Sequence, residues 1–288
     1  MDFRLTDEQQ LFYDSVSRFA RNELAGGAAE RARSHEFPWD VAQKCAEFGL
    51  LGITVPQKDG GIGGSLVDAI LAIQAVAEQC PRSGDVVQAG NFGPIRTFTE
   101  FADERQKARY LPDLLAGRRV ISLGMTEPDA GSAVTELATT AVEDGDHFVI
   151  NGSKIFGTHS SEAEVFLVYV RYGPGLDGIG SILVERGTPG FTIGKASRFM
   201  NGEEWSPLFF DDCRVPRENV LLGRGGFKRQ IAGFNVERLG NSARAVAVGR
   251  HAFNVAREHA ATRRQFGRAL CEFQGLQWKF AEMAVRLE

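Results

Sequence analysis

The chain has 288 residues, of which 33 are Lys or Arg and 37 are Asp or Glu, so its net charge is −4 at neutral pH. This slightly acidic balance argues against nucleic-acid binding as the main function, because surfaces that bind nucleic acids are strongly basic. No apolar run approaches the length of a membrane span, and the first ten residues, MDFRLTDEQQ, lack the apolar centre of a signal peptide. We therefore expect no membrane insertion.

Polar capping residues mark the beginnings of helices in the first third of the chain. The capping patterns are Thr6 with Gln9, Ser65, and Asp103 with Gln106. Another helix is expected over residues 39–48, ending at Gly49. The apolar helix that Ser65 begins is expected to end at Pro81, and Pro112 must bend or interrupt the helix that follows Asp103. Residues 1–117 are therefore expected to form an N-terminal helical domain.

The middle of the chain changes to the alternating period of strands. The segment TTAVEDGDHFVING predicts a hairpin joined through Asp144-Gly145. Further short strands are expected in KIFGT, EVFLVYV, SILVE and WSPLFFDD. We expect a compact β-domain over residues 118–224.

Helical periodicity returns in the last part of the chain. A long helix is expected over residues 234–266, weakened at Gly240 and Gly249, and a second one over residues 271–288. The second helix reaches the last residue with no Gly or Pro to end it. We therefore expect residues 225–288 to be a truncated C-terminal helical domain and the chain to be C-terminally incomplete.

The cysteines and histidines do not follow the spacing of a metal site or a disulfide framework. Four cysteines lie far apart without a CxxC pair: Cys45, Cys80, Cys213 and Cys271. This pattern favours reduced thiols and a cytoplasmic location. His251 and His259 are expected to share a helix face without a third ligand, so no metal site is expected.

Four segments, in this order and spacing, resemble the acyl-CoA dehydrogenase family over essentially the whole chain. They are GMTEPDAGS (124–132), DGDHFVINGSKIFGT (144–158), FFDDCRVPRENVLLGRGGF (209–227) and TRRQFGRALCEFQGLQWKFAEM (262–283). The resemblance implies a mainly α fold: a helical domain, a small β-barrel or sandwich domain and a C-terminal helical bundle, here incomplete. It also implies FAD-dependent α,β-dehydrogenation of an acyl-CoA thioester, an electron-transfer flavoprotein as electron acceptor, and a homotetramer or homodimer.

The resemblance also assigns residues to the FAD. Met125 and Thr126 match positions that hydrogen-bond the pyrimidine end of the flavin, and Ser132 matches one near the pyrophosphate and the CoA arm. Phe156 matches an aromatic residue beside the ring, and the hydroxyl of Thr158 matches one that reaches flavin N5, which accepts the hydride. Fixed donors near the flavin N1 and O2 atoms stabilise the charge that the ring gains. Without the resemblance, GMTEPDAGS suits a capped surface loop, and Phe156 and Thr158 are ordinary strand residues.

A third group of residues is implied to reach the FAD of a neighbouring subunit: Arg263, Phe266 and Gln274. The planar fork of an arginine suits a pyrophosphate, because it donates two hydrogen bonds at once. The simpler alternative is a solvated helix end, where paired arginines are common.

Glu237, in NVERL, is the candidate base for the α-proton. In part of the family the base occupies this position; in the short- and medium-chain types it lies in a later C-terminal segment. A desolvated carboxylate has the raised basicity that this step needs. Arg238 and Asn235 match positions at the acyl-CoA site. The alternative is an ordinary Glu237–Arg238 pair at a helix surface.

Two other functions stay open at this point. The chain could be a non-catalytic acyl-CoA dehydrogenase-like fragment that acts as an interaction module, or an oxidase or monooxygenase on the same fold. The length of the acyl chain cannot be read from the sequence, because pocket residues come from distant helices.

Overall fold

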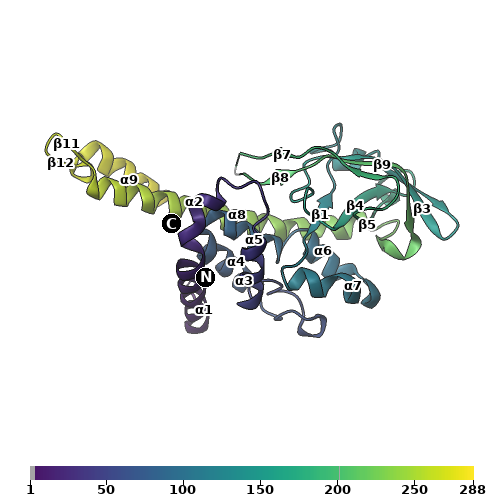
Figure 1. Ribbon diagram of the computed structural model, residues 1–288, viewed down its shortest axis with the longest axis horizontal. Coiled ribbons are helices and arrows are strands. Elements are labelled where there is room, and N and C mark those ends of the chain that lie inside the picture. Colours follow the sequence, from purple (N-terminus) through teal and green to yellow (C-terminus); the bar gives the residue numbers. More distant parts are fainter. Residues whose placement is uncertain (1–3, 201) are drawn as a thin grey trace.

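The computed structural model describes residues 4–200 and 202–288 of the chain. Figure 1 shows the N-terminal helices beside the β-sheet, with one long helix, α8, running along both. The far end of α8 and the last helix, α9, extend away from this body as a separate arm. The order of helices, sheet and helices that the sequence predicts is confirmed.

Helices make up the first part of the chain. Their bounds are α1 Asp7–Phe19, α2 Ala28–Arg31, α3 Trp39–Glu47, α4 Leu66–Ala77, α5 Pro81–Ala89, α6 Pro94–Phe101 and α7 Glu104–Leu115. The caps predicted at Thr6, Ser65 and Asp103 are confirmed, since each side chain accepts a hydrogen bond from the third residue of its helix. Gly49 follows α3 with φ of +78°, which explains why that helix ends there.

The sequence analysis missed α2 and two helices that begin with proline, α5 and α6. Pro81 does not end the apolar helix, which stops at Ala77; it occupies the first turn of α5. Pro94 begins α6 in the same way. The first-turn position suits proline, whose missing N–H would have no helical partner there. Pro112 lies inside α7 and does not interrupt it, since the helix continues to Leu115.

The β-domain is built on one eight-stranded sheet in the order β10-β5-β4-β2-β3-β9-β6, with β1 paired to β4. The strands of this sheet are β1 Ile121–Gly124, β2 Thr140–Asp144, β3 His147–Lys154, β4 Val165–Arg171, β5 Ile179–Glu185, β6 Phe191–Ile193, β9 Leu208–Pro216 and β10 Val220–Leu222. A separate small pair consists of β7 Ser197–Arg198 and β8 Glu204–Trp205.

Two local predictions in the β-domain were wrong. The β2–β3 hairpin pairs Asp144 with His147, so its loop is Gly145-Asp146 and lies one residue later than predicted. KIFGT does not continue a strand: β3 ends at Lys154, and Phe156 has φ of +59°, which a strand cannot contain. The family resemblance marked this segment as part of the site, but the pattern of its residues did not indicate a loop.

The long C-terminal helix α8 spans Phe227–Thr262 and runs uninterrupted through Gly240 and Gly249. Packing explains the glycine at position 240, because a Cβ there would lie 3.1 Å from the buried ring of Phe92. The chain then forms β11 Arg264–Gln265, β12 Arg268–Ala269 and α9 Gln274–Leu287.

Three clusters of buried apolar side chains hold these elements together. One fills the space among the N-terminal helices and reaches Ala243 on α8. A second joins α6 and α7 to the sheet, and a third fills the space between β4, β5 and β9. Among residues 4–200 and 202–288, no helix is both long and apolar enough to cross a membrane. The boundaries at 117/118 and 224/225 stay predictions.

Candidate active site

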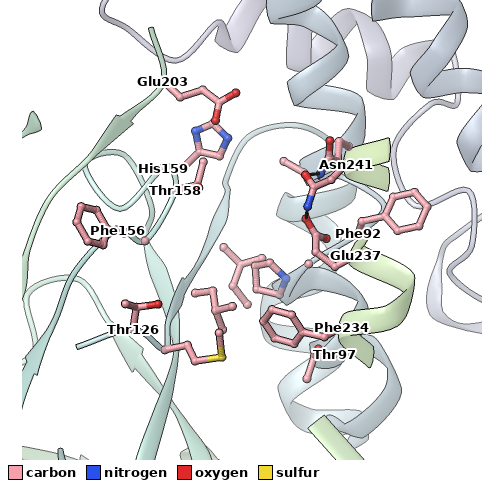
Figure 2. A pocket seen from close by; sticks show the side chains of 18 of the residues that line it. Phe92, Thr97, Thr126, Phe156, Thr158, His159, Glu203, Phe234, Glu237 and Asn241 are labelled. Carbon is pink, nitrogen blue, oxygen red and sulfur yellow. Dashed lines mark hydrogen bonds between the residues drawn. The ribbon is translucent and has the colours of Figure 1, made fainter. Parts of the chain in front are cut away.

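A cavity of about 300 Å³ lies where the helical part of the chain meets the β-domain. The ends of β1 and β3 form one wall, and α5, α6 and α8 form the other. Figure 2 shows Thr126, Phe156 and Thr158 on the β side, with Glu237 and Asn241 on the helical side. Five residues that the sequence analysis assigned to the flavin and the base line this one cavity: Met125, Thr126, Phe156, Thr158 and Glu237.

The two loops on the β side are joined by hydrogen bonds. The backbone N–H of Ile155 donates to the carbonyl of Thr126 at 2.8 Å. The hydroxyl of Ser122, on β1, donates to the carbonyl of Thr158 at 2.9 Å. These bonds fix the Thr126 and Thr158 segments relative to each other, as a preorganised polar wall requires.

A buried ion pair stiffens the loop after β1. Lys154 Nζ lies 2.8 Å from Glu127 Oε1 and also donates to the carbonyl of Met125 at 3.2 Å. Glu127 accepts two further bonds, from the backbone N–H groups of Ala138 and Thr139. Burial alone would raise the pKa of Glu127, but the charge of Lys154 and these bonds lower it. Burial lowers the pKa of Lys154 to about 8.

The segment around Thr158 stores backbone strain. Phe156 and His159 both have left-handed φ angles, +59° and +60°, although neither is glycine. Such conformations cost roughly 1–3 kcal/mol each and occur mainly at functional sites. The ring of Phe156 stays 51% exposed and lies 4.5 Å from the ring of Trp205. The cavity therefore has an uncovered aromatic surface on its β side.

Glu237 faces α5 rather than the solvent. Its Oε1 accepts from Gln88 Nε2 at 3.0 Å and from Asn241 Nδ2 at 3.3 Å. Its Oε2 is buried and has no hydrogen-bond partner among the residues that the structure describes. A Cβ at Gly93 would lie 3.3 Å from Oε2, so the missing side chain there leaves room beside this oxygen. Burial raises the pKa of Glu237.

The sequence analysis missed an ionic cluster beside the cavity, four of whose five residues line the cavity wall. We call Arg82, Asp85, His159, Glu203 and Arg244 the ionic cluster. Arg244 Nη1 contacts Asp85 Oδ1 and lies 3.0 Å from Glu203 Oε1. His159 Nε2 and Arg82 Nη1 lie 3.0 Å and 3.5 Å from Asp85 Oδ2. Figure 2 shows His159 and Glu203 close together above Thr158.

Charges within this cluster shift one another's titration. Burial favours the neutral form of Asp85, but His159 and Arg244 hold the pKa of its carboxyl below the ordinary range. Burial lowers and Asp85 raises the pKa of His159, and the net effect is a rise. Burial, together with the charge of Asp85, raises the pKa of Glu203 to about 7.

The other predicted residues do not line the cavity. Asn235 and Arg238 lie on the exposed face of α8, where Arg238 Nη1 donates to Asn235 Oδ1 at 2.7 Å, and Ser132 is exposed in its loop. Arg263, Phe266 and Gln274 are exposed on the arm formed by the far end of α8 and by α9, and Phe266 is 94% exposed. Their implied roles stay predictions.

Residues 4–200 and 202–288 contain no candidate metal site. They contain no group of three or more His, Cys, Asp or Glu side chains placed to hold an ion. The four cysteines are all free: Cys45, Cys80 and Cys213 are buried, and Cys271 is exposed.

Comparison with known proteins covers the whole chain. Models of the acyl-CoA dehydrogenase N-terminal, middle and C-terminal domains match residues 6–118, 122–213 and 224–288. The chain is 36% identical to the short-chain-specific acyl-CoA dehydrogenase of Clostridium acetobutylicum, over 100% of this chain and 77% of that one.

Two solved structures show the same likeness, and each match covers 100% of this chain and 77% of the other. One, described as the electron transferring flavoprotein of Acidaminococcus fermentans, has a TM-score of 0.92 and 34% identity. The other, the FAD complex of PigA, has a TM-score of 0.90 and 27% identity. The chain therefore belongs to the acyl-CoA dehydrogenase family and is an FAD-dependent oxidoreductase that acts on CH–CH bonds.

Proposed function

We propose that the protein oxidises the α,β bond of an acyl-CoA thioester and that Glu237 removes the α-proton. One observation supports this most directly: the partly buried carboxylate of Glu237 keeps one oxygen, Oε2, without a hydrogen-bond partner among the described residues, at the cavity wall beside Gly93. The other oxygen is held by Gln88 and Asn241. A base needs such an arrangement, because one oxygen must be oriented while the other stays available to accept a proton.

The β side of the cavity fits the flavin ring. Thr126 and Thr158 present polar groups on two loops that hydrogen bonds and the Glu127–Lys154 pair hold in place. The exposed ring of Phe156 offers an aromatic surface for a planar partner. We propose that Met125, Thr126, Phe156 and Thr158 hold the ring. When bound, FAD supplies the acceptor for the β-hydride.

Glu237 is suited to its role by its surroundings. Burial raises its pKa, so the carboxylate is a stronger base than an exposed one. The amides of Gln88 and Asn241 keep the carboxylate from turning away from the cavity. Neither amide titrates, so a change of pH does not remove these two donors.

Residues outside the cavity have proposed roles in binding CoA and in assembly. Asn235 and Arg238 lie on α8 beside Glu237 in sequence and are proposed, with Ser132, to contact the CoA moiety. Arg263, Phe266 and Gln274 are exposed on an arm that extends away from the cavity, which supports a role at the FAD of another subunit in a homodimer or homotetramer. An electron-transfer flavoprotein is the proposed electron acceptor, and the cytoplasm the proposed location.

The test is the reduction rate of the bound flavin. In the FAD-loaded Glu237→Gln variant, anaerobic mixing with acyl-CoA should bleach the flavin band about two to four powers of ten more slowly than in the unmodified protein. Glu258→Gln, an exposed carboxylate on the same helix, is the matched control and should leave the rate unchanged. Bleaching of Glu237→Gln at the unmodified rate would place the base elsewhere.

A further inference from the structure

The cavity has a charged end and an uncharged end. Every charged residue that lines it is either Glu237 or a member of the ionic cluster. Figure 2 shows His159 and Glu203 on one side of Glu237, and Thr97 and Phe234 on the other. We call the side of Thr97 and Phe234 the uncharged end. An acyl chain that starts beside Glu237 extends most favourably toward this end, because its methylene groups then meet no buried charge.

Two hydroxyl groups line the uncharged end without a hydrogen-bond partner. Tyr169, on β4, is 1% exposed and packs in the apolar cluster that joins α6 to the sheet. Its hydroxyl bonds to no residue that the structure describes, and burial alone raises the pKa of Tyr169. The Thr97 hydroxyl, on α6, is likewise without a partner in the described ranges. A Cβ at Gly233 would lie 3.6 Å from Thr97 Oγ1, so this hydroxyl is directed toward α8.

Further polar side chains without partners are buried in the same region. Ser181 lies directly opposite Tyr169 in the β4–β5 pair, and its Oγ has no partner among the described residues. Gln230 is 1% exposed, and both polar atoms of its amide lack a partner in the described part of the chain. It lies one turn before Phe234 on the same face of α8, and Phe227, one turn earlier, packs in the same apolar cluster as Tyr169. Buried polar groups are nearly always hydrogen-bonded, so this region is built for a polar partner that the chain does not supply.

We propose that the uncharged end binds a neutral oxygen-bearing group, a hydroxyl or an oxo group, near the end of the acyl chain, and that Tyr169 and Thr97 bond to it. The preferred substrates are then CoA thioesters of hydroxy or oxo acids. This rests on the proposed function, since it places the acyl chain beside Glu237. A charged group is disfavoured, because it would be buried here without a counterion. A plain alkyl end would cover both hydroxyls without offering them a partner, which is costly for buried groups.

The helix geometry sets the position of the polar group on the acyl chain. Gly233, which faces Thr97, precedes Glu237 by four residues, or about 6 Å along α8. Each bond of an extended chain advances about 1.2 Å, since three backbone bonds span about 3.3–3.6 Å. About five bonds therefore separate the α-carbon from the two hydroxyls. A 6-hydroxyhexanoyl chain, with its α-carbon beside Glu237, brings its hydroxyl oxygen to this place.

The experiment compares 6-hydroxyhexanoyl-CoA with heptanoyl-CoA, which carries a methyl group in place of the hydroxyl. The Kd of each is measured by anaerobic calorimetry on FAD-loaded Glu237→Gln protein, in which turnover is suppressed. 6-Hydroxyhexanoyl-CoA should bind at least about fivefold more tightly, because a buried hydroxyl left without a partner weakens binding by this much or more. In the same background, Tyr169→Phe should reverse the order, because the hydroxyl of the ligand then loses its partner and the methyl group does not.

Two variants of α6 keep the result interpretable. Thr97→Val removes the second hydroxyl and should also reduce the preference, which provides a test if Tyr169→Phe fails to fold. Thr99→Val is the matched control: the Thr99 hydroxyl donates to the carbonyl of Ile95 within the helix and does not line the cavity, so the preference should stay.

Equal or tighter binding of heptanoyl-CoA would overturn the inference and leave the proposed function intact. An unchanged preference in both Tyr169→Phe and Thr97→Val would overturn it as well. If neither thioester binds, acyl-CoA binding itself fails, and the inference fails with it.

Discussion

The buried ion pair between Glu127 and Lys154 determines how firmly the loop after β1 is held. The Lys154 side chain is 0% exposed and that of Glu127 is 8% exposed. Lys154 Nζ binds both Glu127 Oε1 and the carbonyl of Met125. Substituting Lys154 with Met keeps the length of the side chain but removes its charge. Glu127 then stays buried with two backbone donors and no cation.

The expected cost follows from this geometry. Removing one partner of a buried ion pair costs about 3–5 kcal/mol, because the remaining charge is left uncompensated. The double variant Glu127→Gln with Lys154→Met removes both charges, so we expect it to recover about 2 kcal/mol of that loss. The Arg286–Glu282 pair on α9 is exposed on both sides, so Arg286→Met should cost less than about 0.5 kcal/mol.

The assay is urea unfolding followed by circular dichroism, with retention of FAD on dialysis as a second measurement. Lys154→Met should lower the free energy of unfolding and release FAD more readily, because the Met125 and Thr126 segment loses its anchor. If Lys154→Met loses no more unfolding free energy than Arg286→Met, the reasoning is refuted. A double variant as unstable as the single one would also refute it, since the cost would then not come from an unpaired charge.

Three further outcomes are expected. Burial raises the pKa of Glu203 from 4.5 to about 7, so its stabilising contribution is complete below pH 4.5 and is lost as the pH rises through 7. Between pH 5 and pH 8, the free energy of unfolding of the unmodified protein should therefore fall by a few kcal/mol more than that of Glu203→Gln. Both proteins keep Asp85, His159 and Arg244. Gly240→Ala should be about 1–3 kcal/mol less stable than Gly249→Ala, because the added Cβ meets the Phe92 ring in the first and only the tip of Leu287 in the second. Arg263→Ala should release FAD faster on size-exclusion chromatography with unchanged circular dichroism; equal retention would remove Arg263 from the cofactor site.

The first residues of the helices show what local sequence patterns can and cannot predict. Thr6, Ser65 and Asp103 each bond to a backbone N–H three residues away, so their sequence signals and their structures have the same cause. Pro81 and Pro94 show the limit of such patterns. Proline both stops a helix and suits the first turn of the next, and the sequence alone favoured only the first use.

The residues of the cavity also differ in how far the sequence could predict them. Met125, Thr126, Phe156, Thr158 and Glu237 were found because they lie in segments that resemble a family, and the fold brings all five to one cavity. The left-handed backbone at Phe156 was not visible, because the segment has the apolar and β-branched composition of a strand. Tertiary contacts with the loop after β1 override that local preference.

The ionic cluster could not be found from the sequence, for a physical reason. Asp85 and Arg244 come from two helices, His159 comes from a loop, and Glu203 directly precedes β8; each one alone suits an exposed surface. Their meaning depends on being buried together, since a charge is rarely buried without a partner. Only the packing of α5 against α8, and of the β-domain loops against both, makes these four residues neighbours. The resemblance to the family points to the role proposed for Glu237, whereas the ionic cluster depends on contacts among residues that lie outside every motif.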